Sequence, residues 1–289
     1  MLGAGWAADG LSRGSKRCQL SREYLRSAAL LDTLKMRNVF TRLQYQVLKR
    51  ISPREPRIMD GCVYANKSKV AILLGSALLD ETKDKVVIDF GCGEGIEAIE
   101  IAQRGARRVI GVDMRENVLE RARARAQAAG VADRCEFTRH AAERADIILS
   151  LDAFEHFEDP PAILQIMNDL LKPGGLVVAS FGPTWYHPYG GHLFSVFPWA
   201  HLIFTEKALI RWRSDIRNDG ATRFGEVEGG LNQMTIKRFT RLAKSSPFRI
   251  EKLEAVPIGR LRRLHNRLTR EFFTSIVRCT LRKPLDSGT

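Results

Sequence analysis

A glycine-rich turn at residues 89–95 is the first feature of this 289-residue sequence that could do chemistry. The apolar run Val86-Val87-Ile88 leads straight into Asp89-Phe90-Gly91-Cys92-Gly93-Glu94-Gly95. Glycines let the backbone turn sharply and approach a ligand closely, and the carboxyl end of a central parallel strand is the usual binding crevice of an α/β sheet. The GxGxG spacing departs from the dinucleotide fingerprint, and the sequence has no GxxxxGKS phosphate loop.

An acid follows the next predicted strand, because the run Val109-Ile110-Gly111-Val112 ends in Asp113. At this place a carboxylate can accept hydrogen bonds from both ribose hydroxyls of a nucleoside. Strand, turn, helix, strand and acid occur in the required order. The sequence therefore predicts a nucleoside-cofactor site, in preference to a chance glycine turn.

A second candidate site is the acid–histidine cluster in Leu151-Asp152-Ala153-Phe154-Glu155-His156-Phe157. Its polar residues have the spacing that brings side chains together on one turn of helix. One interpretation makes His156 or His192 a general base, with Glu155 as a further catalytic candidate. A second makes these groups ligands of a divalent metal that lowers the pKa of a substrate hydroxyl. A third gives the cluster only a pocket-shaping role, and the sequence leaves all three open. The candidate metal ligands are Asp152, Glu155, His156 and His192.

Aromatic residues gather in the stretch 181–204, which holds eight of them in 24 positions, about four times the 8% average of the chain. The surrounding residues 183–231 contain Gly and Pro and have no clear strand pattern. Such an insert suits a cover over a flat or apolar substrate, and its rings could also stack on nucleobases. The alternative is a small satellite core beneath the insert. The aromatic residues are Phe181, Trp185, Tyr186, Tyr189, Phe194, Phe197, Trp199 and Phe204.

The hydrophobic pattern predicts the elements that position these residues. Strand and helix signals alternate from residue 86 to residue 181, which argues for a parallel sheet with helices on both faces. The predicted strands are 86–88, 108–112, 135–138, 146–151 and 176–181, and the predicted helices are 96–104, 117–129 and 161–171. A helix over 232–245 and two final strands over 249–256 and 274–281 follow the insert.

The two ends of the chain lie outside this alternation. Residues 1–20 are predicted to be disordered, and residues 21–80 to form a helical N-terminal extension, with amphipathic helix over 21–51 and a further helix over 67–79. The spacing of Leu261, Leu264, Leu268 and Phe272 predicts an amphipathic helix over 258–276. This helix is expected to pack against the sheet, with contact to a membrane surface as the alternative.

The charge of the chain is uneven. The net charge is +13; residues 1–60 hold 12 Lys/Arg against 5 Asp/Glu, residues 260–283 hold 8 against 1, and residues 61–259 hold 26 of each. Basic segments can bind nucleic acid or an anionic membrane, although solvated helix faces are the simpler interpretation. The five scattered cysteines form no CxxC pair, which argues against a cysteine-based zinc site and favours reduced thiols in the cytoplasm. No run of 18 apolar residues and no signal peptide pattern is present.

These motifs together resemble a known family. The segment from Val87 to Gly95 resembles motif I of class I S-adenosylmethionine (SAM)-dependent methyltransferases, as found in the type 11 and type 25 groups, and Asp113 matches the ribose-binding acid. Leu171-Lys172-Pro173-Gly174-Gly175 is similar to the family's LKPGG turn, and residues 281–284 resemble the end of its closing strand. The resemblance implies a Rossmann-like seven-stranded sheet of order 3-2-1-4-5-7-6, and a methyltransferase domain over residues 81–284 with a substrate lid at 183–231.

The resemblance also implies where the cofactor lies. Asp89, Gly91 and Gly93 would hold the methionine end of SAM, Asp113 its ribose, and Met114 would lie beside its adenine. One departure is Ala141, which stands where the family often has an acid for the adenine amino group; Glu143 or a backbone carbonyl would replace that acid. The complete set of implied cofactor residues is Asp89, Gly91, Cys92, Gly93, Gly95, Asp113, Met114, Ala142, Leu151 and Asp152.

The acid–histidine motif is similar to the ExxEH of ubiquinone-biosynthesis O-methyltransferases and of small-RNA 3′-end methyltransferases, and the latter group uses a metal. The favoured hypothesis is a methyltransferase for a small organic acceptor, acting on oxygen. One alternative is an RNA methyltransferase whose basic termini bind phosphates. Another is a SAM-binding pseudoenzyme that acts as a scaffold.

Overall fold

The computed structural model describes residues 38–52 and 68–285, apart from residues 195, 218 and 228. Seven strands form one sheet in the order β3-β2-β1-β4-β5-β7-β6, as the resemblance implies. Strands β1 to β5 are parallel to one another, and β7 is antiparallel to both β5 and β6. The strands are β1 (Val86–Phe90), β2 (Arg108–Val112), β3 (Cys135–Thr138), β4 (Ala145–Leu151), β5 (Leu171–Phe181), β6 (Arg249–Pro257) and β7 (Thr274–Arg282).

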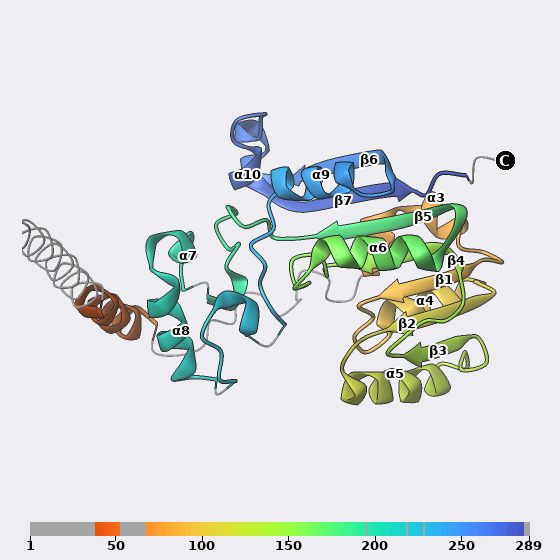
Figure 1. The fold of residues 1–289 in the computed structure, drawn as a ribbon, viewed down its shortest axis with the longest axis horizontal. Coiled ribbons are helices and arrows are strands. Elements are labelled where there is room, and N and C mark those ends of the chain that lie inside the picture. The colour runs from red at the N-terminus through yellow and green to blue at the C-terminus, as the bar shows by residue number, and fades with distance from the viewer. Residues whose placement is uncertain (1–37, 53–67, 195, 218, 228, 286–289) are drawn as a thin grey trace, which may run out of the picture.

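Helices cover both faces of the sheet (Figure 1), because successive strand residues point to opposite sides. Val87 belongs to one buried core, shared with α2, α3, α4 and α5. The neighbouring Ile88 belongs to a second core, shared with α6 and α9. The helices are α2 (Lys69–Leu74), α3 (Ser76–Asp80), α4 (Ile96–Gln103), α5 (Glu116–Ala128), α6 (Pro160–Leu170) and α9 (Ile236–Ser245).

The insert after β5 builds a third core of its own. It contains the short helices η2 (His192–Phe194), α7 (Ala200–Ile203), α8 (Glu206–Ser214) and η3 (Phe224–Glu226). Phe194 is fully buried there, with Trp212 and Phe224 beside it and Tyr45 and Leu48 from the helix over residues 38–51. Aromatic residues of the insert therefore form part of a satellite core, as the alternative interpretation of the insert predicts.

Most element predictions agree with the structure to within a few residues, and the differences have local causes. Strand β5 begins at Leu171, five residues before the predicted start, because Leu171 pairs with Ala145 ahead of a bulge in the ladder. The predicted helix 67–79 is divided at Gly75, which has a positive φ of 77°. The helix predicted from residue 232 begins at Ile236, where the Thr235 side chain accepts a hydrogen bond from Arg238 N. Residues 1–37 and 53–67 lie outside the described residues, so the predictions for residues 1–20 and most of 21–51 are not addressed.

The amphipathic helix predicted over residues 258–276 is wrong. The chain instead forms η4 (Gly259–Leu264), a four-residue helix α10 (Arg270–Phe273) and the start of β7. The Asn266 side chain accepts a hydrogen bond from Leu268 N at 2.9 Å, which forms a tight turn and prevents one continuous helix. Leu268 is 89% exposed rather than packed against the sheet.

No helix in the described part of the chain has the length and apolar content needed to cross a membrane.

Candidate functional site

The glycine-rich turn lies where the sequence predicts it, between β1 and α4. Gly91 N and Cys92 N both donate to Val112 O, at 2.8 and 3.0 Å, which holds the turn against the end of β2. Gly95 has a φ of 75°, and a Cβ there would lie 2.6 Å from the Phe137 ring. Glycine at this position therefore allows both the left-handed backbone and the close packing of α4 on the sheet.

Asp113 stands at the end of β2 with every acceptor position of its carboxylate in use. Its Oδ2 accepts from Gly93 N at 3.1 Å and from an Arg115 guanidinium nitrogen at 3.0 Å. Its Oδ1 accepts from the backbone N and Nε of Arg115, both at 3.0 Å. Partial burial alone raises the pKa of Asp113, but the hydrogen bonds from Arg115 outweigh it, so the pKa lies below its usual value. Asp113 is thus an ionised acceptor that ties the glycine turn to β2.

A cavity of about 680 Å³ opens at the carboxyl ends of these strands. Gly91, Asp113, Met114 and Asp152 line it, as expected for cofactor-binding residues. Ala141 also lines it, in place of the predicted Ala142, which is exposed. An apolar part of the wall consists of Phe90, Val112, Phe157, Ile163, Ile166 and Leu170.

Several predicted cofactor residues lie behind the cavity wall. Cys92 is buried in the core, and burial raises the pKa of its thiol, so it supports the turn from below. Leu151 is buried in the same core. Glu143, the expected substitute for the missing adenine-binding acid, is not a lining residue and forms an ion pair with Arg108 at 3.4 Å.

Asp89 is buried beneath the glycine turn. Burial, together with the nearby Glu97 carboxylate, raises the pKa of Asp89 to about 8. Its Oδ2 atom has no hydrogen-bond partner within the described part of the protein. A buried acceptor without a partner next to a glycine turn fits the ammonium group of an amino-acid ligand, which would supply both a donor and a positive charge.

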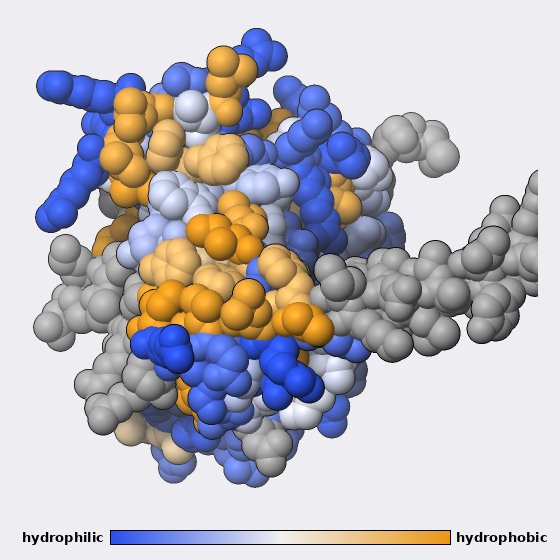
Figure 2. Space-filling view, turned by 90° about the vertical axis from the view of Figure 1, so that its left-hand side faces the viewer, coloured by the Kyte–Doolittle hydropathy of each residue, from blue (hydrophilic) through white to orange (hydrophobic). Residues whose placement is uncertain are grey.

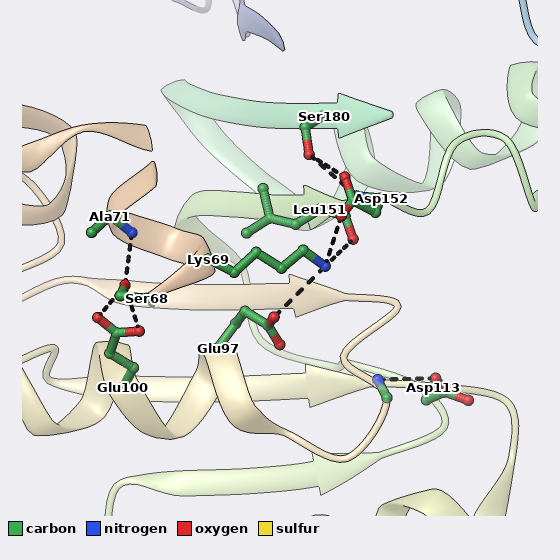
Figure 3. A network of polar contacts seen from close by, with 10 residues as sticks. Ser68, Lys69, Ala71, Glu97, Glu100, Asp113, Leu151, Asp152 and Ser180 are labelled. Atoms are coloured by element: carbon green, nitrogen blue, oxygen red, sulfur yellow. Dashed lines mark hydrogen bonds and ion pairs between the residues drawn. The ribbon is translucent and has the colours of Figure 1, made fainter. Parts of the chain in front are cut away.

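Lys69 reaches this site from the N-terminal side of the domain and was not predicted from the sequence. Its ammonium lies 3.1 Å from Asp152 Oδ2, 3.7 Å from Glu97 Oε1 and 3.5 Å from the Leu151 carbonyl. Figure 3 shows the lysine extending from α2 across the sheet toward the end of β4. The Asp152 backbone has a positive φ of 52°, and its Oδ1 accepts from Ser180 Oγ at 3.1 Å. Lysine and serine together hold the Asp152 carboxylate in place.

Helix α2 is itself fixed to the core, which is why Lys69 can reach Asp152. The Ser68 hydroxyl caps α2 by accepting from Ala71 N at 2.8 Å. The same hydroxyl donates to the Glu100 carboxylate of α4, at 2.7 Å from its nearer oxygen (Figure 3). A serine cap satisfies an otherwise unpaired helix N–H, and here it also sets the position of the following lysine.

His156 lines the cavity, and its tautomer follows from its partner. Its Nδ1 lies 2.9 Å from the Gly230 carbonyl oxygen, which can only accept. Neutral His156 therefore carries its proton on Nδ1, and the Nε2 lone pair can accept another. The rings of His156 and His192 meet edge to face with centroids 5.3 Å apart. His192 does not line the cavity, and burial together with His156 lowers the pKa of His192 to about 4.

Glu155 does not have the position expected of a catalytic acid or base. It points away from the cavity into the protein, where its Oε1 accepts from Gly182 N at 3.0 Å. Burial, with the Asp152 charge next in importance, raises the pKa of Glu155 to about 8. Residues 152–157 form a turn instead of a helix, and Glu155 is buried whereas the adjacent His156 lines the cavity. Glu155 thus supports the end of β5.

The metal site predicted from Asp152, Glu155, His156 and His192 is not formed. Among the described residues there is no group of three or more His, Cys, Asp or Glu side chains that could hold a metal ion. The predicted ligands are directed to different partners: Asp152 to Lys69 and Ser180, Glu155 to Gly182 N, and His156 to the Gly230 carbonyl. The prediction of a metal site at these four residues is therefore wrong, because their side chains do not converge on one point.

The chain is similar to known methyltransferases in sequence. Residues 64–221 match the family described as a methyltransferase domain. The ubiquinone biosynthesis O-methyltransferase of Neisseria meningitidis serogroup C is 39% identical over 107 residues, which are 35% of this chain and 45% of that protein. The protein of the same name from Ruegeria pomeroyi is 36% identical over 99 residues, 32% of this chain and 40% of that protein. The matched segment thus spans less than half the length of these relatives.

Solved structures include a similar fold. An SAM-dependent methyltransferase from Mesorhizobium loti aligns with 72% of this chain and 94% of its own, at 19% identity and a TM-score of 0.47.

Proposed function

The chain belongs to the class I SAM-dependent methyltransferases, and from this premise we propose that it methylates a hydroxyl oxygen of a small organic acceptor. The observation that carries the proposal is the position of His156. His156 lines the same cavity as Asp113 and Gly91. Its Nδ1 donates to the Gly230 carbonyl, which leaves Nε2 as the nitrogen that can accept a proton.

The described residues fit SAM along the glycine turn. The unpaired Asp89 oxygen suits the methionine ammonium, and the Asp113 carboxylate suits the ribose hydroxyls. Exposed Met114 offers an apolar contact for the adenine ring from the wall of the cavity. When bound, SAM supplies an electrophilic methyl group on a sulfonium sulfur.

His156 would take the proton of the acceptor. As the acceptor oxygen forms its bond to the methyl carbon, the carbon–sulfur bond breaks with its electron pair on sulfur, and the hydroxyl proton passes to His156 Nε2. A positioned base contributes a factor of about 10²–10⁴, and alignment of oxygen, carbon and sulfur supplies further acceleration. The products are a methyl ether and S-adenosylhomocysteine, with the proton on His156.

Two observations support a small acceptor and an oxygen atom. The cavity wall includes apolar side chains such as Phe157 and Ile163, which suit an organic molecule. The relatives from Neisseria and Ruegeria carry the name of O-methyltransferases.

The proposal is tested by incubating the purified chain with SAM labelled in its methyl group and with matched sets of phenols, carboxylic acids, amines and thiols. Label on a phenol, with equimolar S-adenosylhomocysteine, is expected. Transfer to carboxylates alone would reject a hydroxyl acceptor, because a carboxylate has no proton for His156 to take. Transfer to amines or thiols alone would reject the oxygen assignment. Transfer to RNA alone would reject the small acceptor, and SAM binding without transfer to any acceptor would favour a scaffold.

A further inference from the structure

The segment between β6 and β7, residues 258–273, is cationic on its outer side. Its basic residues are Arg260, Arg262, Arg263, Arg267 and Arg270, and its single acid is Glu271. The Glu271 carboxylate is used internally, because it accepts from Ile236 N at 3.0 Å and from Lys237 N at 2.8 Å at the start of α9. Glu271 therefore neutralises the N-terminus of α9. No other acid within residues 258–273 is available to neutralise the five arginines.

The same segment exposes large apolar side chains between its arginines. Leu264 is 53% exposed, Leu268 89% and Phe272 40%. Figure 2 shows apolar side chains beside projecting hydrophilic ones near the top of the view, at the height of η4 and α10 in Figure 1. Single exposed leucines are common on protein surfaces, but apolar tips framed by arginines form a surface that is amphipathic over a short distance.

The segment has a defined shape. Asn266 Oδ1 accepts from Leu268 N, and Thr269 Oγ1 donates to the Leu264 carbonyl. His265 Nε2 lies 2.9 Å from Thr274 Oγ1, which joins the turn to the start of β7. These bonds fix the backbone at Leu264 and Leu268. Little conformational entropy is therefore lost when these side chains are buried against a partner.

The segment also lies at the edge of the sheet that carries the candidate active site. Because β7 is antiparallel to β5, with Val277 opposite Phe181, the start of β7 meets the carboxyl end of β5. The segment is tied there to the insert, since Thr184 Oγ1 donates to the Glu271 carbonyl at 3.1 Å. The rings of Tyr186 and Phe272 lie 5.4 Å apart. A surface that docked on this segment would lie beside the insert and the cavity edge.

We propose that residues 258–273 dock the protein on an anionic phospholipid membrane surface. The arginines attract the lipid phosphates, and Leu264, Leu268 and Phe272 enter the interface between headgroups and acyl chains. The two exposed leucines favour this partner over RNA, whose backbone offers phosphates but no apolar phase for aliphatic side chains. Docking here would bring apolar acceptors dissolved in the membrane to the edge of the sheet that holds the cofactor site.

The test is co-sedimentation of the purified chain with vesicles of phosphatidylcholine alone or mixed with phosphatidylglycerol. Wild-type protein is expected to bind the anionic vesicles at low salt and to bind the neutral vesicles much more weakly. Leu264→Ser with Leu268→Ser is expected to lower the partition coefficient at least about tenfold. Arg262→Gln with Arg263→Gln and Arg267→Gln is expected to lower it on the order of 100-fold.

Control variants carry changes of the same kind, at one leucine and two arginines, at the opposite edge of the sheet. Leu285→Ser alters a leucine that is 77% exposed beyond the other end of β7. Arg107→Gln with Arg144→Gln alters exposed arginines just before β2 and β4. These variants are expected to bind vesicles like the wild type, and circular dichroism checks that all variants are folded. Failure of the wild type to bind anionic vesicles, equal losses in both sets, or binding to an RNA oligonucleotide without vesicle binding would each overturn the proposal.

Discussion

The ammonium of Lys69 lies 3.1 Å from the carboxylate of Asp152, which joins helix α2 to the end of β4. Both side chains are 22% exposed, so this ion pair is only partly screened by water. Asp152 lines the cavity, whereas Lys69 approaches it from behind. The pair therefore makes the shape of the cofactor site depend on a helix that precedes the glycine turn in the sequence.

Replacing Lys69 with Met is expected to destabilise the protein by about 1–3 kcal/mol, since it leaves the Asp152 and Glu97 carboxylates without their cation. Urea unfolding measures the change. Lys83→Met, at an exposed lysine, is the control and is expected to change the free energy of unfolding by less than about 0.5 kcal/mol. In the double variant with Asp152→Asn the two losses should not add; full additivity would mean that the ion pair contributes nothing.

Asp113 and Arg115 are expected to differ in their effect on SAM binding. All four acceptor positions of the Asp113 carboxylate are used, three of them by Arg115, so ribose hydroxyls must displace the guanidinium. Asp113→Ala should weaken SAM binding by a factor on the order of 10–100. Arg115→Ala should leave the dissociation constant within about threefold, or lower it, because the competing group is gone.

Isothermal titration calorimetry with SAM measures both constants, and Asp133→Ala, at an exposed acid, serves as the control. If Arg115→Ala weakened binding as much as Asp113→Ala, the guanidinium itself would be part of the cofactor site.

The part of the site that could be predicted from sequence is the part encoded by neighbouring residues. The glycine turn and Asp113 each follow directly on a strand. Parallel strands place their carboxyl ends at one edge of the sheet, independently of the structure of the other segments. Lys69 could not be found in this way. It lies 82 positions before the Leu151 carbonyl that it contacts, on a helix whose cap is set by Glu100 of α4.

The errors in prediction come from turns. Glu155 and His156 are adjacent, and a helical interpretation places both near one cavity, but the tight turn over residues 152–157 directs Glu155 into the protein and His156 to the cavity. Likewise, the leucine spacing after β6 indicates a helix, whereas the Asn266 side chain stabilises a turn. In both cases a hydrogen bond or burial over a few residues outweighs periodicity.

The buried acids predict how stability depends on pH. Burial raises the pKa of Asp89 and of Glu155 to about 8, so the folded state holds two protons that the unfolded chain releases well below that pH. Their contribution is complete below the unfolded pKa and is lost as pH rises through about 8. Burial lowers the pKa of His187 and of His192 to about 4, so their contribution is lost as pH falls from 6.5 toward that value. Between neutral pH and about pH 8 the two acids therefore dominate the change in stability, because the buried cysteine thiols contribute only at higher pH.

The free energy of unfolding is therefore expected to fall between about pH 7 and pH 8, by up to about 1.4 kcal/mol per pH unit for each acid. Urea unfolding in a series of buffers gives the slope. Asp89→Asn should remove about half of it, and Asp133→Asn should leave it unchanged. A stability that rises over this range in the wild type would show that these acids are ionised in the folded protein.

His156 and His192 are the two candidates for the base, and they can be separated by substitution. His156→Gln should lower kcat for a hydroxyl acceptor by a factor of about 10²–10⁴ while SAM binding persists, because Nε2 is the group expected to take the proton. His192→Asn should leave kcat within about threefold, since His192 lies behind the cavity wall. Single-turnover rates with labelled SAM measure the chemical step directly. Added imidazole should restore part of the rate to His156→Ala; a variant with normal kcat, or one that has lost SAM binding together with activity, would assign His156 to shaping the pocket.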